Sequence, residues 1–146
     1  MAWVVDTCLL LDVLDDDPSF GRSSAVCLQD RLSDELVVCP ISFVELAPAF
    51  LGDCDRQTEF LTRMGVAFSE PWSWADTLAA HRAWARYVEL KSAHKIRKRP
   101  VADLLIGAFA ARFGGLITRN PSDFKLLFPS VKLVCPAPGR SQQTAG

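Results

Sequence analysis

Short apolar runs typical of buried β-strands alternate with helical stretches along most of the chain. The strand-like runs lie at residues 3–5, 36–39, 66–68, 116–118 and 131–134. Helices are predicted over residues 18–32, 40–50, 56–64, 74–91, 101–113 and 120–128. Strands that alternate with helices form parallel sheets whose two faces are covered. The sequence therefore predicts an α/β fold, with three α/β/α layers and a central, mainly parallel five-stranded sheet.

The length and composition of the chain are those of one globular domain. It has 146 residues, of which 49% are hydrophobic and 23% are charged, which is enough to bury a core. No apolar run approaches the roughly 20 residues that cross a bilayer, and the N-terminus shows no basic leader. The cysteines include no CxxC pair, which argues against a zinc site. We expect a cytoplasmic protein with one domain over residues 1–135 and a disordered tail over 136–146.

Acidic and basic residues are distributed unevenly between the two halves of the chain. Residues 1–60 contain twelve acids and three bases, whereas residues 61–146 contain five acids and thirteen bases. An acidic half beside a basic half suits a metal site next to a surface that binds a polyanion. The other interpretation is that the two halves simply attract each other, and the charge pattern alone leaves both open.

Four acids occupy similar positions relative to the predicted strands and helices. Asp6 ends the first strand, and Glu45 is expected in the first turn of the helix after the second strand. Asp103 is expected in the first turn of the helix after Pro100, and Asp123 in the short helix after the fourth strand. Loops after the strands of a parallel sheet meet at one edge, which places Asp6, Glu45 and Asp123 together. Asp103 joins them only if the tertiary fold brings it there.

Clustered carboxylates indicate a cation, because several ionised acids repel one another at close range. Oxygen ligands without a nearby histidine or cysteine favour Mg²⁺ or Mn²⁺ over zinc. Such an ion activates water and stabilises the charge that develops on a phosphodiester. Each acid also has a purely structural interpretation. Ser42 and Glu45 match a capping box, Asp123 follows a similar cap at Asn120, and Asp6 and Asp103 suit helix N-termini.

Four segments of the chain carry a recognisable pattern: Val4-Val5-Asp6-Thr7, Ser42-Phe43-Val44-Glu45-Leu46, Ala102-Asp103-Leu104-Leu105-Ile106-Gly107-Ala108 and Thr118-Arg119-Asn120-Pro121-Ser122-Asp123-Phe124. In order and spacing they resemble the signature stretches of PIN domains, and the last looks most like the VapC-type toxins of bacterial toxin–antitoxin pairs. The resemblance covers about residues 3–135. It implies a three-layer PIN-like fold, RNA cleavage that depends on magnesium or manganese, frequent homodimers, and a small antitoxin partner.

The resemblance also implies roles for individual positions. Asp6 and Asp103 match the principal metal ligands, and Glu45 matches the acid that orients metal-bound water or holds the metal through that water. Asp123 matches a fourth acid that helps to hold a second metal or its hydration shell. Thr118 and Asn120 match polar positions that line the pocket.

A run of basic residues precedes the third motif, and it is more basic than we expect from the resemblance to PIN domains. Its candidate RNA contacts are Lys95, Arg97, Lys98 and Arg99. Phosphate contact needs only a few well-placed bases. The run is interpreted as an RNA-binding segment, as a surface that an acidic partner binds, or as a solvated loop.

Several other residues are given a structural interpretation. Asp12 is expected in an exposed turn, and Cys8 has no base to make it a nucleophile. The tryptophans could stack on RNA bases, although Trp84 is expected to pack in the core or in a dimer interface.

The leading hypothesis is a toxin endoribonuclease; the alternatives are a PIN nuclease in RNA processing and a non-catalytic PIN-like binding protein. Metal binding distinguishes the nucleases from the binding protein, because helix caps alone bind no metal.

Overall fold

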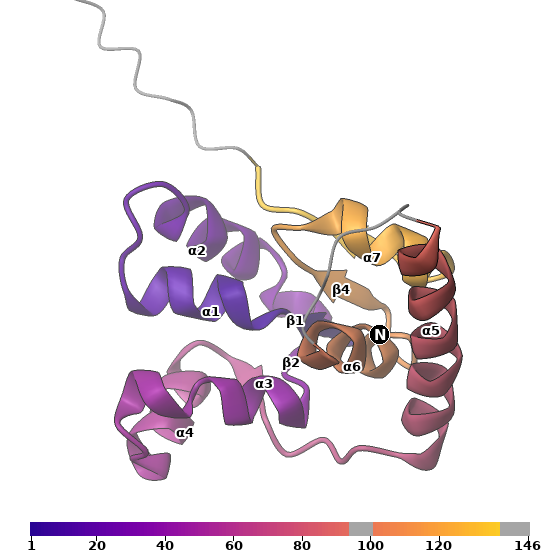
Figure 1. The fold of residues 1–146 in the computed structure, drawn as a ribbon. Helices are drawn as coiled ribbons and strands as arrows, with labels where there is room; N and C mark the ends of the chain where they lie inside the picture. The colour runs from indigo at the N-terminus through magenta and orange to yellow at the C-terminus, as the bar shows by residue number, and fades with distance from the viewer. Residues whose placement is uncertain (94–100, 138–146) are drawn as a thin grey trace, which may run out of the picture.

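The computed structural model describes residues 1–93 and 101–137, and short strands form its central sheet (Figure 1). The strands are β1 (Trp3–Val5), β2 (Leu36–Val37), β3 (Val66–Ala67), β4 (Gly115–Ile117) and β5 (Leu133–Val134). Their order in the sheet is β3-β2-β1-β4-β5, and every neighbouring pair is parallel. β1 is therefore central, with Val4 paired to Val37 on one side and to Leu116 on the other. The predicted parallel sheet of five strands is confirmed.

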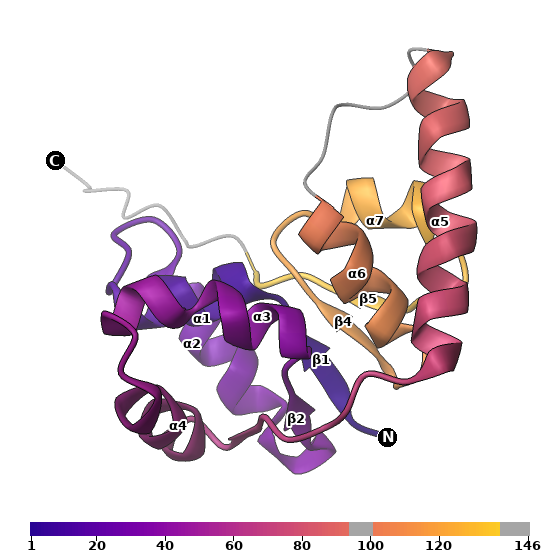
Figure 2. The same ribbon diagram turned by 60° about the horizontal axis from the view of Figure 1, so that its bottom comes forward.

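Helices connect the strands. They are α1 (Thr7–Leu14), α2 (Gly21–Asp30), α3 (Pro40–Glu45), α4 (Cys54–Arg63), α5 (Trp74–Ser92), α6 (Val101–Ala110) and α7 (Pro121–Leu127), with short 3-10 helices η1 (Leu32–Asp34) and η2 (Ala47–Phe50). Neighbouring side chains of the strands enter two separate hydrophobic cores, because successive residues of a strand point to opposite faces. Val4 and Leu116 pack with residues of α5, α6 and α7, whereas Val5 and Ile117 pack with residues of α1, α2 and α4. Figure 2 shows these two helix layers on opposite sides of the strands.

The helix predicted over residues 18–32 is shorter in the structure and begins at Gly21. The Oδ1 atom of Asp17 accepts hydrogen bonds from the amides of Ser19 and Phe20, so Pro18 lies in a side-chain-stabilised turn and not at a helix start. A Cβ atom on Gly21 would lie 3.1 Å from the carbonyl oxygen of Asp12. Glycine therefore permits the close approach of α2 to α1.

Two predictions fall largely outside the described part of the chain. The candidate RNA contacts Lys95, Arg97, Lys98 and Arg99 lie outside the described residues, as does most of the predicted tail over 136–146. The domain boundary at residue 135 stays a prediction. Within residues 1–93 and 101–137, no helix combines the length and apolar character needed to cross a membrane.

Candidate active site

Asp6 lies at the carboxyl end of the central strand, immediately before α1. Its side chain is only 6% exposed. Asp6 occupies the N-cap position of α1, yet its carboxylate makes no side-chain capping hydrogen bond. Instead its Oδ2 atom accepts a hydrogen bond of 2.8 Å from the Oγ1 atom of Thr118, the residue that follows β4. The interpretation of Asp6 as a helix cap is therefore not supported.

Thr118 is fully buried and connects two of the predicted site positions. Its hydroxyl donates to Asp6 and accepts a hydrogen bond of 3.1 Å from the backbone amide of Asn120. Asn120 is exposed and occupies the N-cap of α7, but its side chain makes no capping hydrogen bond. Its amide thus orients the Thr118 hydroxyl toward Asp6, because a hydroxyl that accepts from one side donates from the other.

The fold brings Asp103 to Asp6 although a long stretch of chain separates them. Asp103 is half-buried in the first turn of α6, as predicted. Burial raises the pKa of Asp6 above its usual value, the Thr118 hydroxyl lowers it, and the negative charge of Asp103 raises it further. The charges of the two carboxylates therefore oppose each other near the end of the central strand.

Glu45 lies at a different position in its helix from the one predicted. Pro40 is the first residue of α3 and Cys39 is its N-cap, so Glu45 is the last residue of this helix. The helix begins at Pro40, as the predicted range 40–50 has it, because the fixed φ of proline suits the first helical position. The predicted capping box of Ser42 and Glu45 is wrong: Ser42 lies inside the helix, fully buried, and its hydroxyl has no hydrogen-bond partner among the described residues.

Glu45 is nevertheless connected to the segment that carries Asp6. It is exposed, and its Oε1 atom accepts a hydrogen bond of 2.8 Å from the Oγ1 atom of Thr7. Thr7 is the neighbour of Asp6 and is buried. Sequence reasoning did not identify Thr7, and the only signal was a hydroxyl residue directly after the first acid.

Asp123 lies in the first turn of α7, which follows the turn that contains Thr118 and Asn120. Helix α7 therefore begins at the edge of the sheet where β1 and β4 end. The side chain of Asp123 lies outside the described part of the structure, so its predicted role is untested.

The donor set around Asp6 fits a hard divalent cation. The nearest soft ligand is Cys8, and burial together with the charge of Asp6 raises the pKa of its thiol to about 12. Asp6, Asp103 and Thr118 supply carboxylate and hydroxyl oxygens, which are the ligands that Mg²⁺ and Mn²⁺ prefer. Among the described residues no group of three His, Cys, Asp or Glu side chains is already placed to hold a metal.

Asp12 is buried and not exposed as predicted. Its side chain is 5% exposed, and its Oδ2 atom lies 2.7 Å from Nε of Arg119 in an ion pair that lacks hydrogen-bond geometry. Ser24 donates a hydrogen bond of 2.9 Å to the same oxygen, and the Arg119 guanidinium lies 4.2 Å from the centre of the Phe20 ring. The prediction failed because Arg119 is distant in sequence. Arg119 joins α1 and α2 to the turn that carries Thr118.

No protein-family model matches the sequence, and no curated protein matches it. Among solved structures, the fold matches a chain in the crystal structure of VapBC2 from Rickettsia felis bound to a DNA fragment from their promoter. The TM-score is 0.67 at 18% sequence identity, over 92% of this chain and 98% of that chain. This likeness confirms the three-layer PIN-like α/β fold that the four motifs predicted.

Proposed function

We propose that this chain is a divalent-metal-dependent endoribonuclease whose metal is held by Asp6 and Asp103. The observation that carries the proposal is the state of Asp6. It is buried, oriented by Thr118, opposed by the charge of Asp103, and not used as a helix cap. A bound cation would neutralise two carboxylates that otherwise repel each other. The four segments that resemble PIN domains support the same assignment, and the fold shared with a chain of VapBC2 agrees with that resemblance.

In this proposal, Mg²⁺ or Mn²⁺ supplies a Lewis acid that activates water and neutralises charge on the phosphodiester. Asp6 and Asp103 bind the ion, and Thr118 orients the Asp6 carboxylate. Glu45 is held by Thr7 through one oxygen, and its carboxylate orients and deprotonates the attacking water. Asp123 adds a further oxygen ligand from α7.

A non-catalytic binding protein is the principal alternative. It would use the acids only to cap helices, but neither Asp6 nor Glu45 makes a capping contact. Caps also give no reason to bury Asp6 next to Asp103. The geometry therefore favours the nuclease over this alternative.

We propose further that the chain is the toxin half of a toxin–antitoxin pair, with a small antitoxin protein as partner. Support comes from the VapBC2 structure, in which the matching chain is part of a complex on promoter DNA. We also propose a homodimer, as the resemblance implies. A PIN nuclease that processes RNA without a toxin role remains the second candidate. The two differ in one observation: a free toxin stops growth when it is expressed alone, and co-expression of its antitoxin restores growth.

The test is an RNA cleavage assay on the purified, partner-free chain with a panel of structured RNAs that includes transfer RNA. Reactions contain Mn²⁺, Mg²⁺ or EDTA, and Asp6→Asn is compared with the surface variant Glu59→Gln. Glu59 pairs only with exposed Arg63 on α4 in the described structure. We expect metal-dependent cleavage that Asp6→Asn abolishes and Glu59→Gln retains. Cleavage by folded Asp6→Asn protein at the wild-type rate would refute the site.

A further inference from the structure

Two adjacent residues of one turn contact α1 at two separate points. Thr118 donates its hydrogen bond of 2.8 Å to Asp6, which is the N-cap of α1. Arg119, the next residue, places its Nε atom 2.7 Å from the carboxylate of Asp12, in the second half of the same helix. Asp12 follows Asp6 by six residues, which corresponds to about 9 Å along a helix. The turn is therefore attached to α1 near both of its ends.

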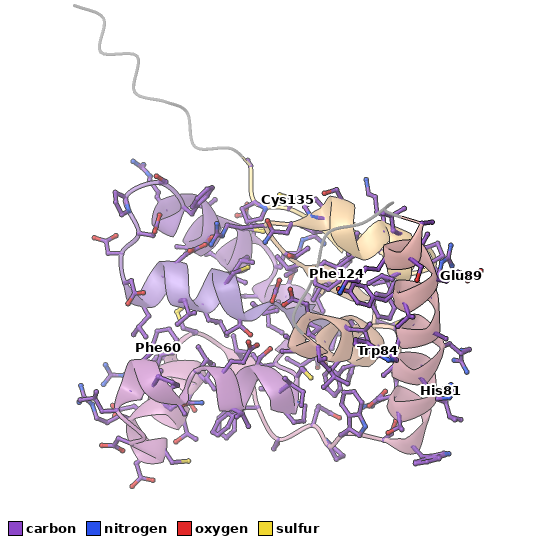
Figure 3. All side chains as sticks on the ribbon, in the orientation of Figure 1. Phe60, His81, Trp84, Glu89, Phe124 and Cys135 are labelled. Atoms are coloured by element: carbon purple, nitrogen blue, oxygen red, sulfur yellow. The ribbon has the colours of Figure 1, made fainter. Side chains whose placement is uncertain are left out.

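The Arg119 side chain is held by its surroundings and is not a free surface group. Its guanidinium lies 4.2 Å from the centre of the Phe20 ring, and only 26% of the side chain is exposed. The Arg119 carbonyl oxygen lies 3.9 Å from the Sγ atom of Cys135, which Figure 3 shows between α2 and α7. A planar guanidinium that stacks on a ring and faces a carboxylate has little freedom to rotate. The backbone of the turn is therefore tied to the position of Asp12.

Stability alone is a weak reason for the ion pair of Arg119 and Asp12. The Asp12 side chain is 5% exposed, and removing charges from water offsets most of what their attraction contributes. Ser24 of the neighbouring helix α2 already donates a hydrogen bond of 2.9 Å to the same carboxylate. The arginine comes instead from the distant segment that carries Thr118. A buried ion pair in this place suits the fixing of one conformation of that segment.

We propose that Arg119 is a positioning residue of the metal site and that it acts through Thr118. Its ion pair with Asp12 fixes the turn, and the turn fixes the direction in which the Thr118 hydroxyl donates to Asp6. A segment attached by one hydrogen bond can pivot about that bond, whereas a second attachment farther along α1 prevents the rotation. This role rests on the proposed metal site at Asp6. It makes the metal affinity depend on a residue that cannot bind a cation itself.

The test is a calorimetric Mn²⁺ titration of variants of the purified, partner-free chain, after circular dichroism has shown that they are folded. Arg119→Met removes the charge and keeps the side-chain stem. Asp12→Asn is the milder second variant, because it removes the opposite charge and keeps an oxygen acceptor. Both changes are compared with the wild type, and Arg119→Met is also made in a Thr118→Val background.

The matched control is Arg112→Met. Arg112 pairs with Asp76 at 3.0 Å, and the two side chains are 32% and 1% exposed, which is close to the 26% and 5% of Arg119 and Asp12. Arg112 lies beyond the C-terminal end of α6, whereas the candidate metal site lies at the first turn of that helix. The control therefore breaks a similar ion pair far from the site.

We expect Arg119→Met to lower the Mn²⁺ affinity by about 10-fold, as is typical for groups that orient metal ligands, and Asp12→Asn to lower it as well. Arg112→Met should lower stability and leave the Mn²⁺ affinity unchanged. In the Thr118→Val background, Arg119→Met should change the Mn²⁺ affinity by less than about 2-fold, because the hydroxyl through which it acts is absent. A change that only weakened the fold would not depend on Thr118 in this way.

Three results would each overturn the role of Arg119. They are wild-type Mn²⁺ affinity in the folded Arg119→Met and Asp12→Asn proteins, an equal loss of affinity in Arg112→Met, and a full further loss in the Thr118→Val background.

A second measurement separates this role from the metal site itself. The Asn120 amide donates to the Thr118 hydroxyl, so its hydrogen exchange reports on the turn without any metal. By NMR in EDTA, we expect this amide to exchange faster in Arg119→Met than in the wild type and in Arg112→Met. Unchanged exchange would overturn the holding of the turn by Arg119. A folded wild-type protein that binds no Mn²⁺ but shows this faster exchange would refute the metal site alone.

Discussion

The Thr118 hydroxyl donates a 2.8 Å hydrogen bond to the Asp6 carboxylate, across the adjacent ends of β4 and β1. Because both residues are buried, this bond fixes the direction of a carboxylate that water cannot reorient. The Asn120 amide in turn holds the Thr118 hydroxyl. The three residues therefore set the geometry of the candidate metal site before any ion binds.

Replacing Thr118 with valine removes this bond and keeps the shape of the side chain. Loss of a group that orients a metal ligand lowers metal affinity or activity by about 10- to 100-fold. We expect a loss of this size in Mn²⁺ affinity and in RNA cleavage, measured by calorimetry and by gel assay. Thr118→Ser retains the hydroxyl and is expected to recover most of both. Wild-type affinity in a folded Thr118→Val protein would show that the bond has no role in the site.

Asp6→Asn is expected to stabilise the metal-free protein while abolishing cleavage. Burial and the charge of Asp103 raise the pKa of Asp6 in the folded state above its usual value of 3.8. The stabilisation that comes from protonated Asp6 is therefore fully present at pH values below the pKa of Asp6 in the unfolded chain. It is lost as the pH rises through the pKa of Asp6 in the folded protein. At neutral pH in EDTA we expect Asn to increase the free energy of unfolding by about 1 kcal/mol. A destabilised Asp6→Asn protein in urea denaturation would argue that the charge is already compensated.

Asp12→Ala is expected to destabilise the fold strongly. The change leaves the Arg119 guanidinium without its opposite charge and the Ser24 hydroxyl without its acceptor. Removing one partner of a buried ion pair costs about 3 kcal/mol, which urea denaturation measures directly. The matched control is Glu59→Ala, which breaks an exposed ion pair with Arg63 and should cost less than about 1 kcal/mol. Similar costs for the two variants would contradict the structural role given to Asp12.

Asp76 is expected to make the stability of the fold depend on pH in the acidic range. Burial alone would raise its pKa, but the two hydrogen bonds from Arg112 and the bond from the Ser73 amide lower it below its usual value. The stabilisation that comes from ionised Asp76 is present at pH values above the pKa of Asp76 in the unfolded chain. It is lost as the pH falls through the pKa of Asp76 in the folded protein. Unfolding free energies at pH 7 and about pH 3 should therefore differ less for Asp76→Asn than for the wild type. An equal difference in the two proteins would show that Asp76 is not responsible.

Much of the fold was predictable because local patterns and chain direction agree. The apolar runs are two to three residues long in the structure, yet their alternation with helices was sufficient to predict the parallel sheet. The position of Asp6 followed from the same rule, because residues after parallel strands share one edge. The position of Asp103 beside Asp6 depends on the tertiary fold and did not follow from chain direction. Only the resemblance of the four motifs to PIN domains indicated that Asp103 belongs to the site.

The errors have specific physical causes. Glu45 was placed in the first turn of its helix because Ser42 looked like the N-cap, whereas the N-cap is Cys39, three residues earlier. Asp12 was expected in solvent because its partner Arg119 lies at the far end of the chain and no local pattern connects them. The first error concerns the local choice of an N-cap, and the second concerns a contact between distant segments, which sequence periodicity does not report.

The most direct test of the central claim is a Mn²⁺ titration of the purified, partner-free chain by calorimetry. Wild-type protein, Asp6→Asn, Asp103→Asn and the surface control Glu59→Gln are compared after their folding is checked by circular dichroism. The account predicts saturable Mn²⁺ binding by the wild type and the control, and its loss in both site variants. Undiminished binding by folded Asp6→Asn and Asp103→Asn, or no binding by the folded wild type, would contradict it.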